Sequence, residues 1–184
     1  MKITTTLATI ALIATTSSVS ADVVVDRAIS ETQVLTAQKA WCEALIDIST
    51  TNSMKGQAAA SELAEKVIDS AYGYQMGVVL FKPTVTVNPN TFRTTREGAL
   101  SYFVGGNPAY PDDKGFALND WTKCEIENSA ILIIGNTAST MGKVHLTDKD
   151  GNVTSVDKSW QFVKDDNGQL RIVLHHSSLE FTGE

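Results

Sequence analysis

Two adjacent histidines near the C-terminus are the side chains best suited to proton transfer near pH 7. His175 and His176 lie in an alternating run, 169–179, that is typical of a β-strand. Neighbouring residues of a strand point to opposite faces, so only one of the two can line a given pocket. His176 shares its parity with Ile172 and Leu174. We therefore expect His176 in a pocket as an acid or base and His175 at a rim or interface. A histidine bonded for structure is the alternative.

Two arginines flank the expected start of a short helix. Thr94 and Glu97 have the spacing of a capping box, which predicts a helix that runs to Val104. A cation at Arg96, in the first turn, opposes the helix dipole and calls for a compensating anion. That anion is either a carboxylate of this chain or a bound ligand. In the second case, Arg93 and Arg96 contact a small anionic molecule.

The sequence lacks the motifs of metal, phosphate and serine-nucleophile sites. There is no CxxC or HExxH pattern, no glycine-rich phosphate loop and no GxSxG elbow. Asp148, Asp150 and Asn152 begin like a calcium loop, but Val153 and Ser159 stand where that loop needs glycine and glutamate. We therefore expect neither a metal nor a cofactor.

Charge and composition narrow the class of partner. The chain has 184 residues, 42% of them hydrophobic, and a formal net charge of −6 at pH 7. These values are typical of one globular domain. No basic run is present to neutralise phosphates, so nucleic acid is not expected as a partner.

The first 21 residues have the composition of a leader rather than of a folded segment. Lys2 precedes a run over 3–14 that is mostly apolar and too short to span a bilayer. Val19-Ser20-Ala21 then forms a small-residue cleavage site. We expect a signal peptide over 1–21, cleavage after Ala21, and a mature chain in the periplasm or secreted, free of the membrane. An uncleaved anchor is the alternative.

The two cysteines, Cys42 and Cys124, are 82 positions apart. In an oxidising compartment they can form one disulfide. Two buried free thiols, packed as small apolar side chains, are the alternative.

Helical periodicity dominates the first half of the chain and strand alternation the second. Ser30 and Gln33 form a capping box before a helix over 31–50, and a second helix is expected over 57–71. Strands are expected over 77–81, 84–87, 121–127, 130–134, 137–146, 154–164 and 169–179, with Asp-Gly at 150–151 and Asn-Gly at 167–168 as hairpin turns. Helices followed by an antiparallel meander predict one α+β domain over 22–184.

Both faces of the last expected strand are partly apolar at its centre. An antiparallel sheet needs only one covered face, and helices can cover that one. A second copy of the chain is the simplest cover for the other face, so we expect a homodimer. A sheet curved enough to wrap its own helices is the alternative.

The order of elements, and three segments within it, resemble the nuclear transport factor 2-like (SnoaL-like) superfamily. The segments are 79–84 (VLFKPT), 92–100 (FRTTREGAL) and 170–178 (LRIVLHHSS). They are similar to bacterial secreted relatives of the calcium/calmodulin-dependent kinase association domain, over about Ser30 to Leu179. The kinase domains carry an arginine in the penultimate strand, where this chain reads Lys158-Ser159-Trp160-Gln161-Phe162.

The resemblance implies a cone-shaped fold whose N-terminal helices pack on a curved antiparallel sheet and enclose a pocket. Tyr72 and Tyr74 stand at a helix end near the implied pocket mouth, so we expect them to contact the ligand. Most aromatic residues at such spacings belong to the core, which is the alternative.

Members of this superfamily include enzymes, ligand carriers and dimerisation modules, so the fold does not decide the function. The sequence favours a periplasmic or secreted protein that binds a small organic, anionic molecule in the cone. Cofactor-free acid–base catalysis by His176 is left open. The alternative is an assembly module without catalysis, in which side chains fill the cone.

Overall fold

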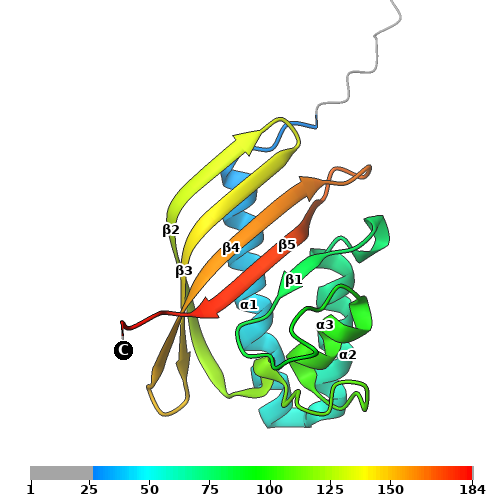
Figure 1. The fold of residues 1–184 in the computed structure, drawn as a ribbon, viewed down its shortest axis with the longest axis vertical. Helices are drawn as coiled ribbons and strands as arrows, with labels where there is room; N and C mark the ends of the chain where they lie inside the picture. The colour runs from blue at the N-terminus through cyan, green and yellow to red at the C-terminus, as the bar shows by residue number, and fades with distance from the viewer. Residues whose placement is uncertain (1–26, 184) are drawn as a thin grey trace, which may run out of the picture.

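The computed structural model describes residues 27–183, which form a curved five-stranded sheet with helices packed on its inner face (Figure 1). The signal peptide expected over 1–21 lies outside the described residues. Within the described part, no helix is long and apolar enough to cross a membrane.

Three α-helices precede most of the sheet: α1 (Glu31–Lys55), α2 (Gln57–Ala71) and α3 (Arg96–Val104). The predicted capping box begins α1, with the Ser30 hydroxyl accepting from the Gln33 amide. This helix continues past the expected end near residue 50 and stops at Gly56, where φ is 84°. Thr95, rather than Thr94, caps α3 by accepting from the Gly98 amide, so the predicted box is wrong by one residue.

The strands are β1 (Leu80–Lys82), β2 (Trp121–Ile134), β3 (Thr137–Asp148), β4 (Val153–Lys164) and β5 (Leu170–Leu179), in the spatial order β1-β5-β4-β3-β2. Strands β2 to β5 form the predicted antiparallel meander, and the two expected hairpin turns join β3 to β4 and β4 to β5. Strand β1 pairs in parallel with β5. The α+β cone fold is confirmed, with a mixed sheet. The strand expected over 84–87 is irregular.

A bulge joins the two segments expected as separate strands, 121–127 and 130–134, into β2. The register shifts between Asn128 and Ala130, opposite Gly142 of β3. A Cβ atom on Gly142 would lie 2.0 Å from the Glu127 carbonyl oxygen, so only glycine permits this approach. Bulges increase the local twist, and here the sheet curves around the helices.

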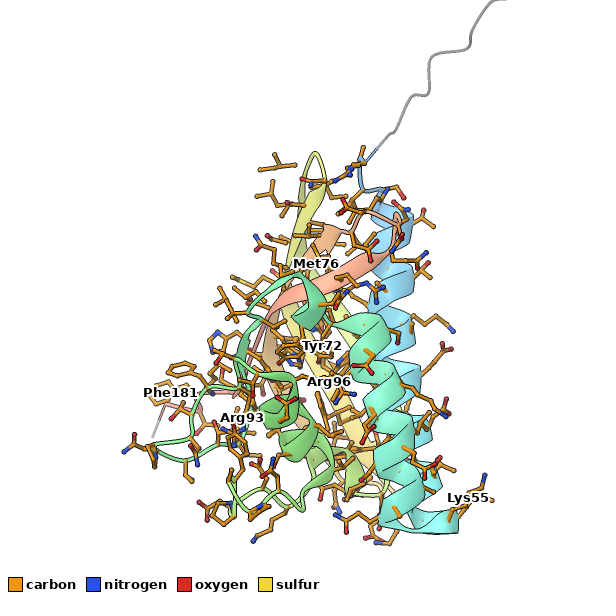
Figure 2. All side chains as sticks on the ribbon, turned by 90° about the vertical axis from the view of Figure 1, so that its right-hand side faces the viewer. Lys55, Tyr72, Met76, Arg93, Arg96 and Phe181 are labelled. Atoms are coloured by element: carbon orange, nitrogen blue, oxygen red, sulfur yellow. A yellow bond between two sulfur atoms is a disulfide. The ribbon has the colours of Figure 1, made fainter. Side chains whose placement is uncertain are left out.

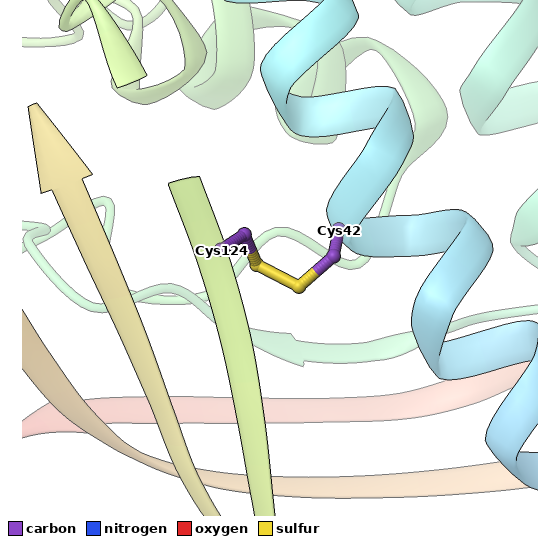
Figure 3. Close-up of a disulfide and its surroundings, with 2 residues drawn as sticks. All are labelled: Cys42 and Cys124. Atoms are coloured by element: carbon purple, nitrogen blue, oxygen red, sulfur yellow. A yellow bond between two sulfur atoms is a disulfide. The ribbon is translucent and has the colours of Figure 1, made fainter. Parts of the chain in front are cut away.

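A disulfide between Cys42 and Cys124 ties α1 to β2 (Figure 3). Their Cα atoms are 5.4 Å apart, within the range that disulfides require. The sequence left open either a disulfide or two free thiols, and the structure contains the disulfide. The pair closes a loop with a sequence separation of 82, and it holds the edge of the sheet against the helix layer.

Candidate functional site

A second bulge, in β5, decides which histidine faces the interior. Between positions 172 and 174, Val173 has no partner on β4. This extra residue shifts the alternation by one, so that His175 joins Ile172 on the inner face. His175 is 2% exposed, whereas His176 is exposed on the outer face. The predicted faces of the two histidines are therefore wrong, because strict alternation does not survive a bulge.

His175 lies at the centre of a buried chain of four polar groups from four elements. Tyr72, which ends α2, has its hydroxyl 2.8 Å from Nδ1 of His175 and accepts a 3.0 Å hydrogen bond from the indole N–H of Trp41. On the other side of the imidazole, Nζ of Lys158 lies 2.5 Å from Nε2. Figure 2 shows Tyr72 between the helices and the sheet, so it is a core residue and not at a pocket mouth as expected.

The surroundings of this chain are aromatic and disfavour charge. Nζ of Lys158 lies 4.4 Å from the ring centroid of Trp41 and 5.1 Å from that of Trp160. Burial lowers the pKa of Lys158 well below its ordinary value. Burial, and then the neighbouring Lys158, lower the pKa of His175 well below its ordinary value. Burial therefore favours the neutral form of both groups.

Three hydroxyl groups gather beside this chain. Thr84, in the irregular segment after β1, donates a 2.7 Å hydrogen bond to Oγ of Ser177, two residues beyond His175 on the same inner face. The hydroxyl of Tyr102 on α3 is buried and makes no hydrogen bond of good geometry. Burial raises its pKa, and the nearby Thr84 hydroxyl opposes that rise. Phe81 separates Tyr102 from His175, with ring centroids 5.7 Å and 4.3 Å away.

A cavity of about 550 Å³ opens at this point. Thr84 and Tyr102 contribute to its wall, together with Val85, Thr86, Val87, Asp112, Asp113, Lys114, Gly115, Phe116 and Asn119. The wall therefore combines hydroxyl groups, apolar side chains and charged side chains, which suits a small polar ligand.

Both candidate arginines are paired with carboxylates of this chain. Arg93 is 2% exposed, lies 2.8 Å from an oxygen of Asp113 and stacks over Tyr110 at 4.5 Å. Arg96 is partly exposed and holds Asp69 of α2 through two nitrogens, at 2.5 and 2.9 Å. Figure 2 labels both arginines. The sequence left open whether the compensating anion is a carboxylate of this chain or a bound ligand, and in the structure it is a carboxylate for both arginines. A ligand-binding role for either arginine stays a prediction.

Tyr74 and His176 lie away from the cavity wall. The half-buried Tyr74 donates a 2.9 Å hydrogen bond to the carbonyl oxygen of Arg93 and stacks on Tyr72. His176 lines a hollow of about 520 Å³ on the outer face of the sheet. Their roles as ligand or catalytic residues stay predictions. Within the described residues, no group of three or more His, Cys, Asp or Glu side chains is placed to hold a metal ion.

Comparison with known proteins decides the family. The family model for metal-independent carbonic anhydrase matches residues 32–179. This chain belongs to that family. The metal-independent carbonic anhydrase of Nostoc sp. (strain PCC 7120) is 65% identical over 158 residues, which cover 86% of this chain and 77% of the relative.

Solved structures of relatives agree with the fold. The iota-carbonic anhydrase from a cyanobacterium, solved as a complex with bicarbonate, superposes with a TM-score of 0.85 at 64% identity, covering 88% of this chain and 99% of that one. A kinase II association-domain protein of Xanthomonas campestris has a TM-score of 0.55 at 24% identity, covering 86% and 96%, which concerns the fold alone. The fold implied by the resemblance to the nuclear transport factor 2-like superfamily is thereby confirmed.

Membership of the metal-independent carbonic anhydrase family corrects the expected function. The sequence favoured a protein that binds an unspecified small molecule in the cone, with acid–base catalysis left open, and a non-catalytic assembly module was the alternative. Neither is correct, because the family is defined by a specific enzymatic activity. The superfamily-level pattern was too general to separate its enzymes from its binding modules.

Sequence reasoning missed most residues of this site, although some carried a signal. Thr84 and Ser177 lie inside the segments that resemble the superfamily, and Lys158 stands where the kinase domains have arginine. Trp41 and Tyr102 carried no signal beyond that of aromatic core residues. The significance of their polar atoms depends on the surroundings in which the fold places them: the indole N–H of Trp41 meets Tyr72, and the hydroxyl of Tyr102 is buried.

Proposed function

We propose that this chain catalyses the reversible hydration of carbon dioxide to bicarbonate and a proton, at the cavity beside Thr84, Tyr102 and Ser177. The family match and the bicarbonate bound by the cyanobacterial relative support this activity. Bicarbonate is also a small anion, in agreement with the kind of ligand that the sequence suggests.

The reaction sets two requirements on the site. Water must lose a proton as its oxygen attacks the carbon of CO₂, which calls for a base. Negative charge then grows on the oxygens of the former CO₂, which calls for hydrogen-bond donors placed in advance. In a family described as metal-independent, side chains of the protein have to meet both requirements.

The observation that carries the proposal is the buried hydroxyl of Tyr102, which makes no hydrogen bond of good geometry, beside the Thr84–Ser177 hydrogen bond. Native proteins rarely leave a buried donor without a partner, and such a group often marks a ligand position. The hydroxyls of Tyr102 and Ser177 can each donate a hydrogen bond to bicarbonate without adding a charge that would hold the product too tightly. Thr84, whose own proton goes to Ser177, orients the Ser177 hydroxyl.

His175 is the base that we propose. Of the described histidines, it is the one on the inner face of the sheet, two residues before Ser177. Its lowered pKa keeps the imidazole neutral near pH 7, so it can accept a proton there.

Stopped-flow CO₂ hydration by metal-free, chelator-treated protein tests the activity. We expect activity in the wild type and a loss of roughly 10²-fold in Ser177→Ala, the range reported for removing one such donor. Ser178→Ala is the matched control, because Ser178 is the next residue on the same strand and should leave the rate unchanged. A wild type without activity, or equal rates for the two variants, would contradict the proposal.

We also propose that two copies pair through the outer face of the sheet. Leu80, Leu132 and Met141 are 56%, 60% and 64% exposed there. The cross-strand row of Leu132, Ser139, Gln161, Leu174 and Leu80 carries no charge, so two copies can pack it without burying one. Light scattering should show a dimer for the wild type. It should show a monomer for Leu132→Glu, because that variant would bury a charge in the interface. A monomeric wild type at micromolar concentration would contradict pairing.

For location, we propose export and cleavage after Ala21. The Cys42–Cys124 disulfide supports an oxidising compartment. The intact mass of the protein recovered from the producing cells should begin at Asp22. A mass that retains the leader would contradict this.

A further inference from the structure

The residues proposed for the reaction do not include Lys158, whose amine is buried. Lys158 is 5% exposed on the inner face of β4, and lysine is almost never this buried unless it is paired. Within the described residues, its close partners are the imidazole of His175 and the indole faces of Trp41 and Trp160. None of them is a carboxylate, so charge neutralisation does not account for the amine.

The hydrogen-bond geometry restricts where the protons of this chain can lie. The indole N–H of Trp41 can only donate, so the Tyr72 oxygen accepts from it. The Tyr72 proton is then directed to Nδ1 of His175, and the imidazole carries its own proton on Nε2, facing the amine. A neutral amine accepts that proton with its lone pair. Each of the four polar groups has a hydrogen-bond partner and none is charged, which is the arrangement that burial favours.

A second arrangement holds one additional proton. Lys158, as an ammonium, donates to Nε2, and Nδ1–H of His175 donates to the Tyr72 oxygen, which has a second acceptor position. The ammonium then lies against two indole faces, which attract cations. A second added proton would put two positive charges 2.5 Å apart, so the pair takes up only one.

We propose that Lys158 is a positioning residue for CO₂ hydration: it holds the proton of His175 on Nε2 and keeps the proton released by water on the Lys158–His175 pair. This inference rests on the proposed carbonic anhydrase activity. The balance is one CO₂, one water and the neutral pair giving bicarbonate and the singly protonated pair. That proton then passes to buffer and restores the neutral pair.

On the inner face, the groups that surround the Lys158–His175 pair are a tyrosine hydroxyl and aromatic rings, and none of them competes with the pair for a proton. Tyr72 faces it from the end of α2, and Trp41, Phe81 and Trp160 present aromatic rings from α1, β1 and β4. His176 acts from the outer face of β5, where its charge lowers the pKa of His175 further. The neutral, proton-accepting pair is therefore the form that higher pH favours.

Nitrogen-15 NMR of the imidazole rings tests the positioning role without any activity measurement. We expect the Nε2–H tautomer for His175 in the wild type. In Lys158→Met, Nε2–H would face an apolar side chain, so the proton should move to Nδ1 and donate to Tyr72. Lys164→Met, which removes a buried lysine from the same face of β4, should keep the wild-type tautomer. An unchanged His175 tautomer in Lys158→Met would overturn the proposal.

Kinetics test the proton-holding role. We expect kcat to fall roughly 10- to 100-fold in Lys158→Met with KM nearly unchanged, since the amine does not touch the substrate. Lys158→Gln serves if the methionine variant does not fold, because its amide can accept from Nε2–H but cannot take up a proton; kcat should still fall. In Lys158→Arg, kcat should also fall, because the guanidinium group stays charged and accepts no hydrogen bond.

Full kcat in Lys158→Arg would show that a cation suffices and would overturn the proposal. A pH profile of kcat that is identical in the wild type and Lys158→Gln would do the same. A wild type without CO₂ hydration would instead contradict the carbonic anhydrase function, while the tautomer comparison would still decide whether Lys158 positions the His175 proton.

Discussion

The hydroxyl of Thr84 donates a 2.7 Å hydrogen bond to Ser177 across 93 positions of sequence. This bond attaches the irregular segment after β1 to the inner face of β5, and both hydroxyls belong to the site proposed for bicarbonate. The proposed site therefore combines two segments that meet only in the folded chain. Lys82 reinforces the junction by donating a 2.9 Å hydrogen bond to the Ser177 carbonyl oxygen.

Removing the Thr84 hydroxyl should lower activity more than stability. Thr84→Val keeps the shape of the side chain but loses the hydrogen bond that orients the Ser177 hydroxyl, so we expect kcat/KM to fall by roughly 10- to 100-fold. A neutral hydrogen bond contributes only about 1 kcal/mol to the free energy of unfolding. Stopped-flow kinetics and urea unfolding measure the two effects. Thr122→Val, at an exposed threonine, is the control. An equal loss of activity in that variant would contradict a specific role of the Thr84 hydroxyl.

Tyr102→Phe should stabilise the protein while it reduces catalysis. The hydroxyl is buried without a partner, so its removal should raise the free energy of unfolding by about 1 kcal/mol. The same change removes a proposed donor, and CO₂ hydration should fall at least tenfold. Tyr72→Phe should destabilise instead, because Trp41 and His175 both lose a partner. A less stable Tyr102→Phe protein would show that the hydroxyl is satisfied in the free enzyme.

The two histidines should differ in their effect on the rate. His175→Gln removes the proposed base and should reduce kcat by about 10²-fold or more. His176→Gln changes an exposed side chain on the outer face and should reduce kcat less than about threefold, within what surface substitutions cost. The opposite ranking, measured by stopped-flow assay at pH 8, would restore the catalytic role first expected for His176.

Stability should fall as the pH is lowered from 7.5 to 5. Burial lowers the pKa of His175 in the folded state below that of the unfolded chain, so the unfolded chain binds the proton first. The unfolding free energy then decreases with falling pH, with a slope of at most about 1.4 kcal/mol per pH unit for this residue. Urea unfolding at several pH values measures the slope. His175→Gln should flatten it, and an unchanged slope in that variant would assign the effect to other groups.

Loss of the disulfide should weaken the fold. In the chain-entropy description, a loop of this length contributes about 4.5 kcal/mol to the free energy of unfolding. The double variant Cys42→Ser, Cys124→Ser should therefore lower that free energy by several kcal/mol and leave the rate of the folded protein within about twofold. Unfolding curves with and without reductant provide the check. A midpoint that is the same for the oxidised and reduced protein would contradict the structural role of the bridge.

Local chemistry determined much of the architecture before any tertiary contact was known. The Ser30–Gln33 capping box, the span of α2 and the two Xaa-Gly hairpin turns were all predictable, because caps and turns depend on residues within a few positions of one another. The helices-then-meander order followed from the change in hydrophobic period. The family resemblance at superfamily level also came from these local patterns.

The site itself was decided by tertiary structure. A single unpaired residue, Val173, reverses the faces of His175 and His176. The local sequence pattern does not predict this bulge, because the bulge depends on how β5 pairs with β4. The arginines singled out by charge met carboxylates of their own chain, while Lys158 was buried between Trp160 of its own strand and Trp41 of the distant helix α1. Composition and spacing specify which groups a chain carries. Only long-range packing specifies which of them lose water and meet, and desolvation of groups in contact is what makes a hydroxyl, an imidazole and an amine into a reactive site.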